Sequence, residues 1–104
     1  MVFRTAAQKK EFCADCPVAR AADLIGDSCS LLIVRDLMDG TKRFGELQQS
    51  LEGVSSRTLT NKLKFLLREK VLARDKTGGY ILTKKGAALD PVIESMRRYG
   101  KKYL

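Results

Sequence analysis

The side chains of this sequence that could react are three thiols, Cys13, Cys16 and Cys29, because its 104 residues include no histidine. Cys16 stands immediately before Pro17, and proline favours the first position of a helix, so Cys16 is the expected N-cap residue. The unpaired amides and the dipole of a helix N-terminus, with Arg20 one turn further on, would stabilise a thiolate there. A thiolate reacts with oxidants and electrophiles, but the pattern is at least as consistent with an inert thiol.

Other kinds of reactive site are not indicated. Cys13 and Cys16 form a C-x-x-C pair, but a thioredoxin-like role needs a βαβ setting and a zinc site needs four ligands. Cys29 lies among apolar residues and is expected to fill space in the core. The sequence has no paired carboxylates, no nucleophile with a base and no phosphate-binding loop. We therefore expect neither an enzyme nor a bound metal or cofactor.

A helix-turn-helix is predicted in the middle of the chain. Its second helix is marked by four leucines at helical spacing, Leu59, Leu63, Leu66 and Leu67. Ser55 or Ser56 can cap that helix. Residues 44–51 form a shorter amphipathic segment, and a glycine-containing break at 52–53 separates the two, as in a helix-turn-helix.

The face of the second helix that lies opposite the leucines is the expected DNA-reading surface. It carries the candidates for contacts with base edges, which are Ser56, Arg57, Thr60, Asn61 and Lys64. In the major groove arginine can bind guanine with two hydrogen bonds, and asparagine can bind adenine. The candidates for phosphate contacts are Thr41, Lys42, Arg43, Ser55, Lys76, Thr77, Lys84 and Lys85. The alternative is that these are solvated residues, since any surface helix needs a polar outer face.

The elements around this motif predict a winged helix and a dimer. Two short strands are expected on either side of residues 76–79, where Gly78-Gly79 suits a tight hairpin. Two helices precede the motif, one beginning at Pro17 and one capped by Ser28, and a last helix runs from about Lys84 to Tyr103. The apolar positions of the last helix step by three and four, which is typical of a helix–helix seam. The predicted dimer interface is Leu89, Val92, Met96, Tyr99 and Tyr103, unless this seam packs on its own domain.

Length and composition fit one domain, residues 1–104, with an N-terminal arm or helix at 1–16 and a C-terminal dimerisation helix at 84–104. The predicted fold class is mainly α with a small β-hairpin, a winged helix-turn-helix with flanking dimerisation helices. Twenty basic against twelve acidic residues give a net charge of +8, which favours a polyanionic partner such as duplex DNA. The predicted two-fold dimer would read an inverted-repeat operator. No apolar run could span a membrane and the N-terminus does not resemble a signal peptide, so a cytoplasmic protein is expected.

Seven collinear phrases resemble the HxlR-type branch of the MarR-like winged-helix regulators, over roughly residues 13–104. They are CPV at 16–18, DLIG at 23–26, LLIVRDL at 31–37, GTKRFGEL at 40–47, GVSSRTLT at 53–60, LTKKG at 82–86 and YG at 99–100. The resemblance implies a homodimeric DNA-binding regulator, often one that responds to oxidants or electrophiles through the cysteine before Pro-Val, here Cys16. The effector would be an oxidant or a small molecule. The alternatives are a regulator that binds a non-covalent ligand or senses nothing, and a winged helix used only for protein contacts. This chain departs from the family at Cys29, which replaces an aromatic residue, at Phe65, and in its shorter wing.

Overall fold

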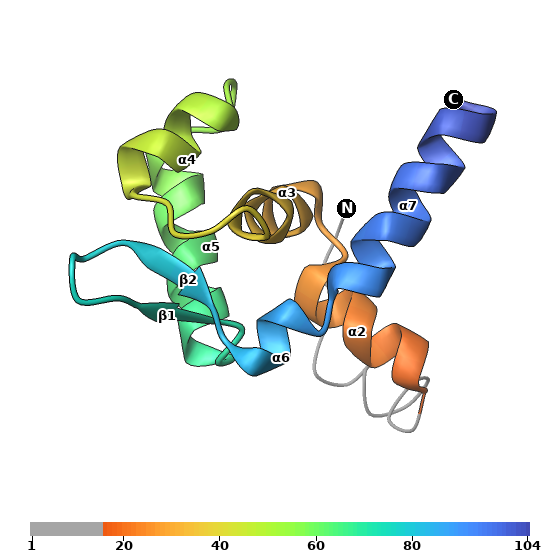
Figure 1. The fold of residues 1–104 in the computed structure, drawn as a ribbon, viewed down its shortest axis with the longest axis horizontal. Helices are drawn as coiled ribbons and strands as arrows, with labels where there is room; N and C mark the ends of the chain where they lie inside the picture. Colours follow the sequence, from red (N-terminus) through yellow and green to blue (C-terminus); the bar gives the residue numbers. More distant parts are fainter. Residues whose placement is uncertain (1–15) are drawn as a thin grey trace.

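The computed structural model describes residues 16–104, in which a mainly helical body carries a short β-hairpin at one edge (Figure 1). The elements are α2 (Pro17–Ile25), α3 (Ser28–Leu37), α4 (Phe44–Ser50), α5 (Ser56–Arg68), β1 (Leu72–Arg74), β2 (Tyr80–Leu82), α6 (Lys84–Ala87) and α7 (Asp90–Tyr103). The fold class predicted from the sequence, mainly helical with one antiparallel hairpin, is confirmed. The arm or helix predicted at 1–16 lies outside the described residues, apart from Cys16.

α3 is the central helix, and it contacts α2, α4, α5, α7 and β2. Its residues Ile33 and Val34 are fully buried and belong to the same hydrophobic cluster as Leu47 of α4 and Leu63 of α5. Burying a side chain of this size stabilises a fold by roughly 1.5–3 kcal/mol. α3 is therefore the support on which both helices of the predicted motif are held.

α4 and α5 form the predicted helix-turn-helix. Gly53, in the turn between them, has a φ of 96°, a conformation that residues with a side chain rarely adopt. Ser55 is the N-cap of α5, because its Oγ accepts a hydrogen bond from the Thr58 N–H at 3.1 Å. Of the four predicted leucines, Leu59, Leu63 and Leu66 are buried and Leu67 is half-buried. The leucine face of α5 therefore points into the core as the spacing predicts.

The hairpin follows α5 directly and forms the wing. β1 and β2 pair antiparallel, with Leu72 opposite Leu82 and Arg74 opposite Tyr80. A third segment joins them, because the backbone of Lys42 donates to the Tyr80 carbonyl at 3.1 Å and accepts from the Tyr80 N–H at 2.8 Å. The connection between α3 and α4 is thus attached to the wing, so the wing and the helix-turn-helix form one surface.

Two helix boundaries differ from the sequence prediction. α3 is capped by Asp27 rather than by Ser28, since the Asp27 carboxylate accepts from the Ser30 N–H at 2.7 Å. The single helix predicted over residues 84–104 is divided into α6 and α7. Pro91 explains the division, because in a continuous helix its ring would clash with the carbonyl group four residues earlier. Pro91 instead occupies the first turn of α7, where its missing N–H is tolerated.

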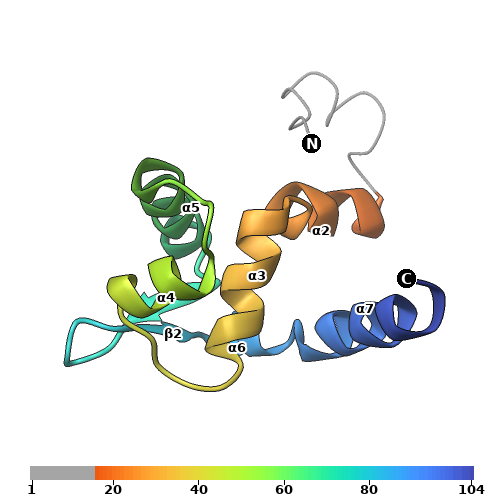
Figure 2. The same ribbon diagram turned by 90° about the horizontal axis from the view of Figure 1, so that it is seen from above.

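α7 extends away from α4, α5 and the hairpin (Figure 2). Its buried residue, Ile93, belongs to the core cluster, and α7 contacts α3. Of the predicted seam, Leu89 packs partly against the core. The other four side chains form an exposed apolar stripe, with exposed fractions of 42% for Val92, 50% for Met96, 61% for Tyr99 and 63% for Tyr103. The described part of the chain therefore leaves this stripe uncovered.

Candidate nucleic-acid interface

The outer face of α5 brings the predicted base-reading residues together. Ser56, Arg57, Asn61 and Lys64 are exposed, and Thr60 is half-buried at the edge of the face. They lie on the side of α5 that faces away from α3, because the leucines of the same helix hold it against the core. A positively charged guanidinium, an amide and an ammonium group thus point into solvent from the first three turns of one helix.

Lys62 does not belong to this face, although the sequence places it among the basic residues of the motif. Its Nζ lies 3.3 Å from Oδ2 of Asp27, and both side chains are largely shielded from solvent. The ammonium group of Lys62 is therefore directed at the start of α3, and the outward basic residues of α5 are Arg57, Lys64 and Arg68.

The tip of the wing is organised by Asp75, which the sequence analysis did not single out. Its Oδ1 accepts from the Thr77 hydroxyl at 2.7 Å, from the Thr77 N–H at 2.9 Å and from the Gly79 N–H at 2.8 Å. The hydrogen bond from the Thr77 side chain is the main cause of a lowered pKa of the Asp75 carboxyl group, and Thr41 and the two amides add to it. An aspartate followed by a glycine-containing turn is the available sequence signal for such a loop.

The two wing residues predicted to contact phosphate, Lys76 and Thr77, differ in how available their side chains are. Lys76 is exposed between residues that hold the turn, so its charge is presented to solvent at the tip. Thr77 is exposed too, but its hydroxyl proton is already donated to Asp75. A phosphate contact from Thr77 would therefore compete with the bond that shapes the wing.

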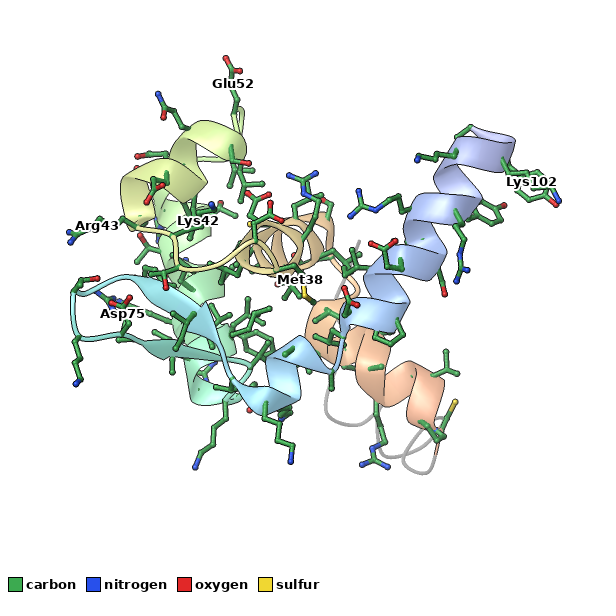
Figure 3. The ribbon with its side chains drawn as sticks, in the orientation of Figure 1. Met38, Lys42, Arg43, Glu52, Asp75 and Lys102 are labelled. Carbon is green, nitrogen blue, oxygen red and sulfur yellow. The ribbon has the colours of Figure 1, made fainter. Side chains whose placement is uncertain are left out.

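The segment before α4 lies beside the wing. Thr41 packs on Gly79, where an added Cβ would overlap the Thr41 methyl group. Lys42 is half-buried, while Arg43 is exposed and has its N–H bonded to Glu46 Oε1 at 3.0 Å. In Figure 3 the side chain of Arg43 extends outward on the same side of the molecule as Asp75. The structure thus brings Arg43 near the wing, whereas Lys42 mainly contributes backbone hydrogen bonds.

Lys84 and Lys85 lie apart from the wing tip. Both are exposed in α6, which follows the end of β2 that is remote from the turn. Nζ of Lys85 donates to the carbonyl oxygen of Glu69 at 2.8 Å, just after the end of α5. That bond gives Lys85 a structural role at the C-terminus of the helix, where a cation is favourable.

The two described thiols differ sharply in environment. Cys16 is exposed at the N-cap of α2, as predicted, but its side chain makes no capping hydrogen bond to the helix amides. Cys29 is buried, and burial is the main cause of its raised pKa, with a further contribution from the charge of Asp27. Cys29 is therefore held as a neutral thiol in the core. Cys13 lies outside the described residues.

Residues 16–104 provide neither a metal site nor a membrane span. No group of three or more acidic or cysteine side chains there is arranged to hold a metal ion. The same residues include no helix with the length and apolar character needed to cross a membrane.

Comparison with known proteins identifies relatives along almost the whole described chain. Residues 24–104 match the family described as HxlR-like helix-turn-helix. The HTH-type transcriptional regulator YodB of Bacillus subtilis is 32% identical over 95 residues, which cover 85% of each chain. The crystal structure of quinone-bound YodB matches with a TM-score of 0.76 and 34% identity, over 85% of this chain and 99% of that one.

Two other solved structures are similar. The crystal structure of PA1607 gives a TM-score of 0.81 at 41% identity, over 94% of this chain and 70% of that chain. The redox regulator HypR, in its reduced form, gives a TM-score of 0.76 at 27% identity, over 82% and 90% of the two chains. The family match extends from α2 to the C-terminal residue and includes the helix-turn-helix, the wing and α7. This chain belongs to the HxlR-like helix-turn-helix family and is a transcriptional regulator of the HTH type.

Proposed function

We propose that this protein binds duplex DNA sequence-specifically, as a homodimer on an inverted-repeat operator, and regulates transcription from the cytoplasm. The observation that carries the proposal is the outward face of α5, where Arg57, Asn61 and Lys64 are exposed beside a basic wing. The first turns of a recognition helix meet base edges in the major groove, which is the position of Arg57 and Asn61.

The side chains divide into two roles. Arg57 and Asn61 have the donor and acceptor groups that distinguish guanine and adenine, so they are assigned to base reading. Ser56, Thr60 and Lys64 extend that face. Arg43 and Lys76 present exposed charge at the edge of the surface and are assigned to phosphates. Lys84 and Lys85 contribute at most a long-range electrostatic attraction for DNA, because they lie away from the wing tip.

The homodimer is supported by α7. Its apolar stripe is uncovered in the described chain, and an exposed contiguous stripe of this kind marks an interaction surface. Two copies joined by a two-fold axis through this helix would present two recognition helices in inverted orientation. The operator half-sites are then expected one or two helical turns apart.

Selection of bound fragments from random duplex DNA tests the proposal. The expected result is an inverted repeat, with Arg57→Ala and Asn61→Ala each losing about 1–3 kcal/mol of binding on it and tolerating more bases at one position. Arg98→Ala, an exposed basic residue on α7, is the matched control and should bind normally. Enrichment of no sequence, or equal losses for all three variants, would contradict base reading by α5.

The proposed effector is an oxidant or electrophile that modifies Cys16. Cys16 is the exposed described thiol, and the similar proteins include YodB, solved with a quinone, and HypR, a redox regulator. Alkylation followed by mass spectrometry should modify Cys16 in the folded protein and leave Cys29 protected, because Cys29 is buried and neutral. Oxidant should change operator binding in the wild type and not in Cys16→Ser. An equal change in both proteins would contradict the assignment.

A non-covalent effector would have a different site. A groove of about 320 Å³ lies between α3 and α7, with Leu31, Leu32, Ile93 and Met96 among its lining residues. An apolar ligand bound there would act between the dimer helix and the helix that supports α5. Oxidant-independent release of the operator by such a ligand, retained in Cys16→Ser, would favour this alternative over thiol modification.

A further inference from the structure

The ion pair between Asp27 and Lys62 connects the recognition helix to the helices that support it. Lys62 Nζ and Asp27 Oδ2 are 3.3 Å apart, and their side chains are only 19% and 13% exposed. A charge pair shielded to this degree is much less screened by salt than a surface pair. Removing one partner leaves the other charge without compensation in a poorly solvated place.

Asp27 has two structural roles at once. Its Oδ1 accepts from the Ser30 N–H at 2.7 Å and so caps α3, while its Oδ2 faces Lys62. Asp27 also follows Gly26, the C-cap of α2, whose N–H donates to the Ala22 carbonyl at 2.7 Å. A Cβ on Gly26 would overlap that carbonyl oxygen, so the corner between α2 and α3 is tightly closed. The Asp27 carboxylate is thus held in place by α2 and α3, independently of its contact with α5.

Lys62 lies on α5 close in sequence to two residues of the outward face. It lies directly after Asn61 and two residues before Lys64, both of which face outward. Neighbouring residues on a helix are 100° apart, so a fixed direction for Lys62 fixes the directions of both. The Asp27–Lys62 pair adds one polar contact to the leucine contacts that hold α5 on the core.

We infer that the Asp27–Lys62 pair is a positioning device that sets the rotation of α5 on α3 and thereby the sequence selectivity of the proposed DNA contact. Lys62 acts through the base-reading residues and does not touch DNA itself. The inference rests on the proposed function of α5 as the recognition helix.

The test uses Lys62→Met, which keeps the length of the side chain, and Asp27→Asn, which keeps an oxygen to cap α3. Each variant is compared with Lys101→Met, an exposed lysine of α7, after circular dichroism has established that it is folded. Affinity is measured for the selected operator and for a scrambled duplex of the same length, over a range of salt concentrations.

A positioning role predicts that Lys62→Met and Asp27→Asn each weaken operator binding at least tenfold and change scrambled-duplex binding less than threefold. The salt dependence should be unchanged, because no phosphate contact is lost. The double variant should lose less than the product of the two single losses, since each single change strands the partner's charge.

Two results would overturn the inference. If Lys62 contacts phosphate, Lys62→Met lowers both affinities together and flattens the salt slope by about one unit, while Asp27→Asn has no effect. If the pair only stabilises the fold, both variants melt earlier and keep full selectivity. A wild-type protein that shows no selectivity at all would instead contradict the proposed function.

Discussion

The exposed stripe on α7 allows a quantitative prediction of how Tyr99→Ala affects association of the dimer. Tyr99 is 61% exposed, and its ring lies 5.0 Å from that of Tyr103, so it contributes little to the core of its own chain. We expect Tyr99→Ala to change the free energy of unfolding of the monomer by less than about 0.5 kcal/mol, as for most surface substitutions. The effect should fall on association instead.

The size of that effect follows from the area still to be covered. Fully burying a large apolar side chain is worth about 1.5–3 kcal/mol, so covering the exposed part of Tyr99 is worth about 1 kcal/mol. A two-fold interface contains the residue twice, which gives about 2 kcal/mol and a dimer dissociation constant about 30-fold higher. The DNA contacts themselves are untouched by this substitution, so operator binding should weaken only where the protein concentration falls below the new dissociation constant.

Sedimentation equilibrium over a range of protein concentrations measures the dissociation constant directly. Arg98→Ala is the matched control, because it removes an exposed neighbour of the stripe on the same helix. Two results would refute the reasoning: a wild-type protein that is monomeric at micromolar concentration, or equal dissociation constants for Tyr99→Ala and the control.

Two further predictions concern the wing. The pKa of Asp75 is lowered in the folded state, so the Asp75 carboxylate stabilises the fold above the ordinary aspartate pKa of about 3.9, and this stabilisation is lost as the pH falls through the lowered value. Acid titration should therefore destabilise the wild type more steeply below about pH 4 than it destabilises Asp75→Asn. Parallel stability curves for the two proteins would contradict the role of this carboxylate. In Gly86→Ala the new Cβ would overlap the carbonyl oxygen of Val71, so we expect a loss of roughly 1–3 kcal/mol in urea unfolding. Gly45→Ala, where the Cβ meets open space, should not be destabilised, and equal values for the two variants would show that α6 does not pack closely on the wing.

The helix-turn-helix was predictable because its signals are local. The leucine spacing of α5, the serine cap and the glycine turn each act over a few residues, and the structure confirms all three. The outward position of Arg57 and Asn61 follows from the same periodicity. A pattern that is local in sequence thus placed the candidate base-reading residues on one face.

The parts that the sequence analysis missed depend on contacts between distant segments. The sequence left Lys62 off the outward face but could not predict its ion pair, because its partner Asp27 belongs to the start of another helix. The pairing of Lys42 with Tyr80 joins segments on either side of the helix-turn-helix. The division of the C-terminal helix was different in kind, since Pro91 is a local signal that the seam pattern obscured.

Whether α5 reads DNA sequence is tested most simply by comparing two proteins on two DNA duplexes. Wild type and Arg57→Ala are titrated, at one salt concentration, with the selected operator and with a scrambled duplex of the same length. Base reading by α5 predicts that the wild type prefers the operator by about a thousandfold or more. Arg57→Ala should then lose about 1–3 kcal/mol, roughly five- to 150-fold, on the operator and little on the scrambled duplex. Equal wild-type affinity for the two duplexes, or an equal loss on both in Arg57→Ala, would contradict it.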